Sequence, residues 1–220
     1  MGLFRSLLMS QPKNAVKGTR LLEYIESTGE QAFITDFILS SDTGTTELKV
    51  NPTDGISDTQ GIYGFISPVK AQRISIGIYR REYFVSQGFT NFIGEPSSEA
   101  SIIKWDRLNS KAWVNGVEIE NIQRAEVTTH LNAGVFKRAA TEDSFGLGFF
   151  TGRINWIKEY DDEGNLLFNL VACEKDGKIG MFDSVANKFY FNTGTGNFVG
   201  GKQIGWIQDD GTIINYVKRS

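Results

Sequence analysis

The 220-residue chain has few of the residues that support metal, thiol or histidine chemistry. It contains one cysteine, Cys173, and one histidine, His130. A single cysteine excludes an intrachain disulfide, and the two residues together supply neither a zinc ligand set nor a context for a catalytic triad. The apolar residues beside Cys173 predict a small buried side chain in a strand. We predict no cofactor, no metal site and no catalytic residue.

Long apolar runs are also missing. No segment reaches the roughly 20 apolar residues that a membrane-spanning helix needs, so we expect no membrane partner. Residues 1–10 are too short for a secretory signal and lack a cleavage pattern. Residues 1–6 formally fit the N-myristoylation pattern, which is loose enough to match by chance. The formal net charge of −3 argues against a nucleic-acid partner.

Acidic residues are absent from residues 1–20, which carry four basic residues. Their apolar positions are spaced as on one face of a two-turn helix, and such a helix is unstable alone in water. Two interpretations remain open: a disordered terminus, or an arm that gains order by docking into another protein. The residues expected to anchor the arm are Leu3, Phe4, Arg5, Leu7, Leu8, Lys13 and Lys17.

Strand patterns dominate the rest of the chain. Glycine is abundant (24), proline is scarce (4), and there are 16 phenylalanines, a composition that favours sheets joined by tight turns. Residues 153–160 alternate, with Ile154 and Trp156 on one side and Ile157 on the other. Asn115-Gly116 between apolar residues predicts a hairpin. About a dozen such strands with short turns predict an all-β, antiparallel two-sheet jelly-roll sandwich.

The predicted organisation has three parts. Residues 1–20 form the arm, residues 21–201 the sandwich, and residues 202–220 a C-terminal hairpin with Asp210-Gly211 as its turn. The hairpin is expected to cover a sheet edge or to pair with another copy of the chain. Trp206 lies within it and is our candidate for an interface residue.

Several segments carry a family resemblance. They are, in chain order, Leu22–Gln31, Ile34–Asp36, Trp113–Gly116, Gly152–Asp161, Gly180–Asp183, Asn187–Tyr190 and Asn192–Phe198. Together, from about Leu21 to Gly201, they resemble the concanavalin A-like lectin/glucanase (laminin-G-like) β-sandwich domain. The resemblance implies a jelly-roll fold. Domains like it recur in bacteriophage and gut-bacterial proteins, commonly as virion or surface proteins.

Catalysis by a glucanase mechanism would need two carboxylates about 5 Å apart across a cleft. The candidate acids are Glu118 and Glu120 on the solvent side of a strand, Glu142 with Asp143, Glu159 with Asp161, and the acidic turn 161–165. That turn offers oxygens to Ca²⁺, but it lacks the spaced acids of a dedicated loop and is interpreted as an ordinary acidic turn. We therefore expect a protein that is not an enzyme.

Carbohydrate binding would use exposed aromatic rings beside hydrogen-bonding side chains. The candidates are Tyr63, Tyr79, Tyr83 and Trp105, with Asn109 as a polar partner. Aromatic residues of sandwiches also fill cores, so each has a structural alternative. Trp113 and Trp156 lie inside alternating strands and are expected to be core residues.

The resemblance and the basic arm together predict a non-enzymatic structural protein of a bacteriophage particle, of the decoration or fibre type. It would sit on the particle exterior, contact other virion proteins through its arm, and display a lectin-like sandwich that binds host-surface glycans for adhesion. By analogy we expect a homo-oligomer, a trimer. The alternative is a bacterial surface or secreted carbohydrate-binding module.

Overall fold

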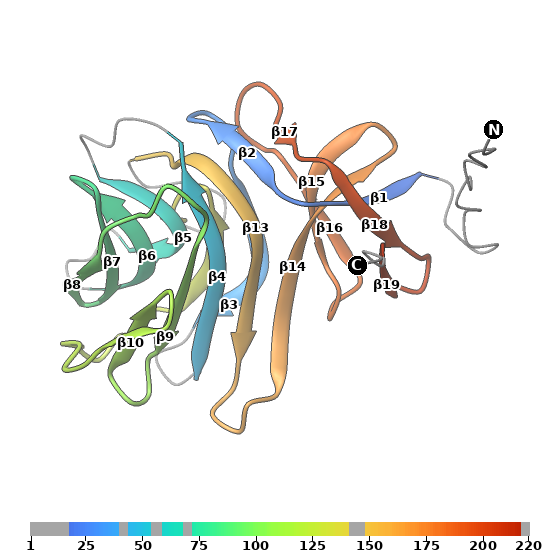
Figure 1. Cartoon of the computed structure of the whole chain (residues 1–220). Coiled ribbons are helices and arrows are strands. Elements are labelled where there is room, and N and C mark those ends of the chain that lie inside the picture. The colour runs from blue at the N-terminus through green and yellow to red at the C-terminus, as the bar shows by residue number, and fades with distance from the viewer. Residues whose placement is uncertain (1–17, 40–43, 54–58, 68–71, 141–147, 217–220) are drawn as a thin grey trace, which may run out of the picture.

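The computed structural model describes residues 18–39, 44–53, 59–67, 72–140 and 148–216 (Figure 1). These residues form strands and turns without any helix, so the described part of the chain has no helix that could cross a membrane. The strands make two antiparallel sheets packed as a sandwich. The predicted all-β, two-sheet architecture is confirmed.

The larger sheet has 13 strands. In spatial order its main row is β11 (Val117–Ile119), β10 (Lys111–Val114), β9 (Ser101–Asp106), β4 (Thr45–Pro52), β13 (Thr151–Tyr160), β14 (Leu166–Lys175), β1 (Thr19–Leu22), β18 (Gln203–Ile207) and β19 (Ile213–Asn215). Its other strands are β2 (Ile25–Thr28), β15 (Lys178–Asp183), β16 (Lys188–Phe191) and β17 (Val199–Gly200). Of these, β15 pairs with β14 and β16, while β2 pairs with β13 and β17.

The second sheet has six strands. Its spatial order is β3 (Phe33–Leu39), β12 (Leu131–Val135), β5 (Gln60–Ile66), β6 (Arg73–Tyr79), β7 (Glu82–Gln87) and β8 (Phe89–Gly94). In β6 the side chains of Ile74, Ile76 and Ile78 are buried in the core. Because side chains alternate along a strand, Arg73 and Tyr79 belong to the opposite, outer face.

Two apolar cores hold the molecule together. The main core fills the space between the sheets. A smaller one lies under the C-terminal hairpin, where Leu21, Cys173, Phe182 and Ile207 pack together. Burial raises the pKa of the Cys173 thiol to about 12, as expected for the small core residue that the sequence predicted.

A β-bulge in β13 changes which side chains face inward. The register with β4 shifts between Ile154 and Trp156, so Ile154 and Ile157 both reach the core, while Trp156 is only half-buried. An inserted residue moves the following side chains to the other face. The strict alternation predicted for this strand, and the core position predicted for Trp156, were therefore wrong.

Trp113 was also wrongly expected in the core. Its neighbours Ala112 and Val114 are buried, so the tryptophan lies on the outer face of β10. There its indole Nε1 donates a hydrogen bond to Glu118 at 2.9 Å, and the Lys104 ammonium lies 5.1 Å from its ring centroid.

One hairpin turn is formed by the residues expected from the sequence, and another is not. Asn115 and Gly116 have φ of 52° and 83°, the left-handed conformations of a type I′ turn, which confirms the hairpin between β10 and β11. The hairpin between β6 and β7 instead turns on Arg80 and Arg81, with φ of 49° and 68°. No turn-forming residue marks that position in the sequence.

The first strand of the described chain pairs with the second-to-last one. β1 begins at Thr19 and lies between β14 and β18, and β19 extends the sheet beyond β18. Trp206, in β18, lies opposite Arg20 on one side and Ile214 on the other and is half-buried. In Figure 1 these strands occupy the right end of the molecule and β8 the left end.

Candidate functional site

Three of the aromatic residues predicted to bind carbohydrate lie in the main core. Tyr63, Tyr83 and Trp105 are each at most 1% exposed, so none offers a ring face to a sugar. Burial raises the pKa of the Tyr83 phenol to about 12. The prediction was wrong for these three because alternation separates the two faces of a strand but does not tell which face meets the other sheet.

The remaining two candidates lie apart from one another. The Asn109 side-chain amide donates to the Asp106 carboxylate at 2.8 Å, and its backbone N–H donates to the same group at 2.9 Å. Asn109 thus closes the turn after β9 and does not line a pocket with the tyrosine. Tyr79, at the end of β6, is half-buried and lines a surface pocket.

That pocket, here called the β5–β8 pocket, lies on the outer face of the six-stranded sheet and has a volume of about 370 Å³. Its lining residues are Thr59, Arg73, Tyr79, Phe84, Thr90, Phe92 and Arg138. A pocket with aromatic walls and a few convergent polar groups is the usual form of a small-ligand site.

Its floor is a row of residues that crosses four strands. Gly61 on β5 lies opposite Gly77 on β6, Gly77 opposite Phe84 on β7, and Phe84 opposite Phe92 on β8. A Cβ on Gly77 would come within 2.4 Å of the Phe84 ring, and one on Gly61 within 2.6 Å of Arg138 Cγ. The two glycines therefore make room for the Phe84 ring and the Arg138 side chain against the sheet.

Two arginines give the pocket a positive charge. Arg73 donates to the hydroxyl oxygens of Ser86, at 2.5 Å, and Thr90, at 3.1 Å. Arg138 lies with its guanidinium carbon 6.0 Å from the Phe84 ring centroid. Burial lowers the pKa of Arg138, and the neighbouring charge of Arg73 lowers it further. Because the two positive charges repel each other, an anion bound beside them would stabilise both.

Sequence reasoning missed most of this pocket. Arg73 was detectable, because the alternation of β6 places it on the same face as Tyr79. Arg138 was not, because it follows β12 outside any named strand and reaches the pocket only because the next residue, Ala139, forms an isolated bridge with Phe65 of β5.

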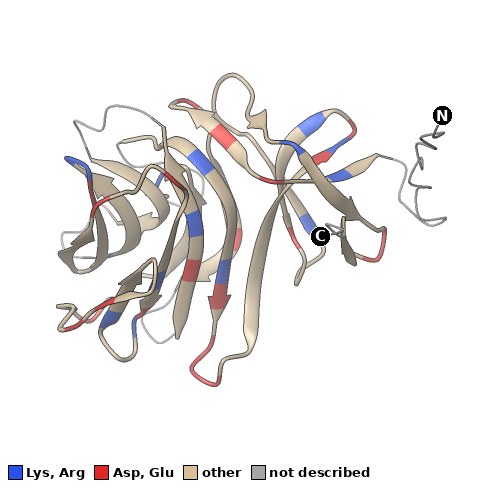
Figure 2. Ribbon diagram, in the orientation of Figure 1, with Lys and Arg blue, Asp and Glu red and all other residues tan. Residues whose placement is uncertain are grey.

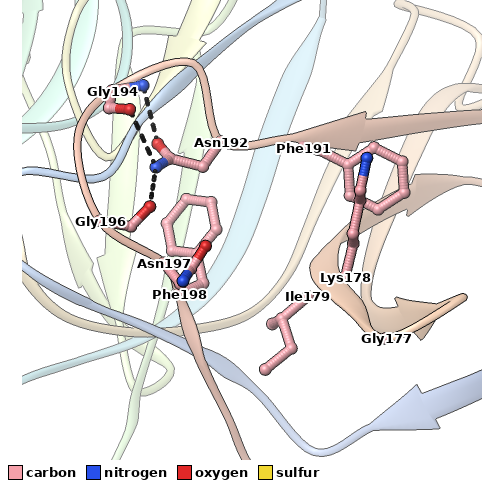
Figure 3. Close-up of a pocket in the computed structure, with 9 residues that line it drawn as sticks. All are labelled: Gly177, Lys178, Ile179, Phe191, Asn192, Gly194, Gly196, Asn197 and Phe198. Carbon is pink, nitrogen blue, oxygen red and sulfur yellow. Dashed lines mark hydrogen bonds between the residues drawn. The ribbon is translucent and has the colours of Figure 1, made fainter.

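A second hollow, of about 490 Å³, lies beside the loop that follows β16 (Figure 3). The Asn192 side chain accepts from the Gly194 N–H at 2.9 Å and donates to the Gly196 carbonyl at 2.8 Å. Its amide therefore holds the loop in shape. Of the described residues that line this hollow, Lys178 alone is charged, so the hollow offers a ligand fewer directional groups than the β5–β8 pocket.

The described acids considered for catalysis have other partners. Lys111 Nζ lies 2.5 Å from Glu118 and 3.5 Å from Glu120, and the hydrogen bond from this lysine lowers the pKa of Glu118. In the turn after β13, hydrogen bonds from Asn165 lower the pKa of Asp161. Within the described ranges, no three His, Cys, Asp or Glu side chains gather as a metal site would require.

A buried ion pair was also missed. Arg107 Nη2 lies 2.8 Å from Glu159, and both side chains are fully buried. The Thr46 hydroxyl donates to the same carboxylate at 2.7 Å. Burial raises the pKa of Glu159, and Arg107 and Thr46 act in the opposite direction. The pair lies inside the sandwich, where it serves the fold rather than a ligand.

The predicted arm residues and two of the candidate acids lie outside the described part of the chain: Leu3, Phe4, Arg5, Leu7, Leu8, Lys13, Lys17, Glu142 and Asp143. Trp206 is described and half-buried, and its part in an interface stays a prediction. No protein-family model and no curated protein sequence matches this chain. The resemblance to the concanavalin A-like domain therefore also stays a prediction, next to a two-sheet architecture that is consistent with it.

Proposed function

We propose that this chain is a non-enzymatic structural protein of a bacteriophage particle, attached through its basic N-terminal segment and presenting a glycan-binding pocket on the outer face of its six-stranded sheet. The resemblance to lectin-like sandwich domains supports the structural and glycan-binding roles. A homo-oligomer, in the simplest case a trimer, belongs to the same proposal, and light scattering of the purified chain measures it.

The observation that carries the proposal is the position of the β5–β8 pocket. β1, into which the N-terminal segment leads, lies at one end of the molecule, and β7 and β8 lie at the other (Figure 1). A chain attached through its N-terminus would therefore hold the pocket away from the attachment point. Tyr79 and Phe92 supply the aromatic surface on which sugar rings stack.

The proposal that the protein is not an enzyme is supported by the interactions of the acidic side chains considered for catalysis. Glu118 and Glu120 share one lysine, Asp161 is engaged in its turn, and Glu159 is paired inside the core. Among the described residues, none that lines the β5–β8 pocket is acidic, whereas glycoside hydrolysis by the common mechanisms needs a pair of carboxyl groups there.

The attachment is tested by deleting residues 2–17. The deletion should stop there because Thr19 and Arg20 pair with β14. The truncated protein should keep its thermal unfolding temperature yet fail to join particles. The matched control replaces Arg5, Lys13 and Lys17 with glutamine, which keeps the length and removes charge. Unchanged incorporation of the deletion variant would overturn the anchoring role.

Glycan binding is tested separately with the full chain on an array of bacterial surface polysaccharides. Binding that depends on Phe92 is the expected result, and binding to none of them would remove the glycan-binding role and leave attachment to be judged by incorporation. Glycan binding without incorporation into particles would favour the alternative, a bacterial surface or secreted carbohydrate-binding module.

A further inference from the structure

Arg138 is a largely buried cation that lines the β5–β8 pocket. It exposes 8% of its surface, and its Nε has no hydrogen-bond partner in the structure. Within the described residues no carboxylate forms a salt bridge with it. Burying a charge is costly unless it is paired, so the position is unfavourable for the protein alone and would become favourable with an anion in the pocket.

A second cation faces the same space and is held in place. Arg73 donates to Ser86 and Thr90, and both acceptors are neutral hydroxyl groups, so they orient the guanidinium without neutralising it. Two guanidinium groups that share one pocket form a fork of donors suited to a planar carboxylate.

The sheet is shaped to hold Arg138 where it lies. A Cβ on Gly61 would also come within 3.1 Å of Arg138 Nε. The glycine thus lets the side chain cross the strand at close range and reach the ring of Phe84. Such close packing restricts the Arg138 side chain before binding, so less conformational entropy is lost when an anion binds.

An apolar wall stands beside the charge. The rings of Tyr79 and Phe92 lie 6.3 Å apart between centroids, and Phe92 exposes 48% of its surface. An exposed phenylalanine next to the buried Arg138 and the half-buried Arg73 is a poor fit for inorganic phosphate or sulfate alone. It suits a ligand that carries both a negative group and an apolar ring face.

We propose that the β5–β8 pocket binds an acidic saccharide, with a sugar carboxylate held by Arg138 and Arg73 and the sugar ring packed against Tyr79 and Phe92. This inference rests on the proposed glycan-binding function and specifies its ligand class. A uronic-acid polymer has the required chemistry, because each ring carries one carboxylate beside an apolar face.

The test compares trigalacturonate with its fully methyl-esterified form by isothermal titration calorimetry. The two have the same rings and differ in the charge of the acid group. We expect the free acid to bind about 10- to 100-fold more tightly than the ester, as for hydrogen bonds to charged groups, and its affinity to fall as salt is added.

Three variants locate the interaction. Arg138→Met should reduce the affinity for the free acid to that for the ester and leave the ester unchanged. Arg153→Met is the matched control, because that arginine also lies over an aromatic ring, Tyr24, but on the larger sheet. It should bind both ligands as the native protein does. Phe92→Ala should weaken both ligands.

The outcomes separate this inference from the proposed function. Equal affinity for acid and ester, with both weakened by Phe92→Ala, would overturn the acidic ligand class while glycan binding stands. Inorganic sulfate that binds as tightly as trigalacturonate would overturn the saccharide. If trigalacturonate and the ester both fail to bind while a neutral glycan on the array does, the ligand class is wrong and the function is retained.

Discussion

Arg107 and Arg138 are both buried, but their surroundings differ. Arg107 is 1% exposed and lies 2.8 Å from the carboxylate of Glu159. Arg138 is 8% exposed and lies above the Phe84 ring with a second arginine as its charged neighbour. Burial alone thus does not separate a structural charge from a binding charge. What separates them is whether the fold supplies the counter-charge.

The outer faces of the two sheets show the same contrast. On the larger sheet one row crosses five strands through Lys158, Glu47, Lys104, Trp113 and Glu118. Charges of opposite sign face each other in this row, an arrangement that stabilises a sheet, and charged residues of both signs recur on β4 and β13 (Figure 2). In the β5–β8 pocket, by contrast, the described lining residues include two positive charges and no acid.

The largest expected effect comes from breaking the paired charge. Arg107→Met leaves Glu159 buried without its partner and should lower the free energy of unfolding by about 3–5 kcal/mol. Chemical denaturation measures the loss. Combining it with Glu159→Leu should restore most of the stability, because no unpaired charge remains. A single variant as stable as the native protein would show that the pair is not structural.

Gly77→Ala, at the floor of the β5–β8 pocket, should cause a smaller loss in the free energy of unfolding. The added Cβ would lie 2.4 Å from the Phe84 ring and 2.5 Å from the Gln60 carbonyl oxygen, and such overpacking costs about 1–3 kcal/mol. Ser75→Ala, on the same face of β6, is the control and should stay close to native stability in the same denaturation experiment.

Arg138→Met should not lower the free energy of unfolding, in contrast to Arg107→Met. It removes a buried charge that forms no salt bridge with any described residue and replaces it with an apolar chain, so the free energy of unfolding should stay level or rise by up to about 1 kcal/mol. Thermal denaturation with and without trigalacturonate is the measurement. A loss as large as that of Arg107→Met would mean that Arg138 is part of the framework.

The smallest effect is expected at the surface pair on the larger sheet. Lys111 contacts Glu118 and Glu120, and all three side chains are solvent-exposed. Exposed ion pairs contribute little to stability and are screened by salt, so Lys111→Ala should leave the denaturation midpoint unchanged within error. A clear decrease would show that the charged row on this face is cooperative.

Much of the architecture was predictable because it depends on local patterns. Alternation in β6 and β9, and the Asn115-Gly116 and Asp210-Gly211 turns, are encoded within a few residues. The bulge in β13 was not, because the extra residue is defined only by the register with β4. For the same reason the predicted exposure of Trp105 and of Trp156 was wrong, because it depends on which strand face meets the other sheet.

The sequence by itself determined the all-β class of this protein through its short alternating strands and its hairpin turns rich in glycine. Only the tertiary structure decided which side chains share a pocket. Arg73 and Arg138 are 65 positions apart in the numbering, and they meet because one lies on β6 and the other crosses β5 over Gly61. Pairing between distant strands creates such neighbours, and no local pattern records it.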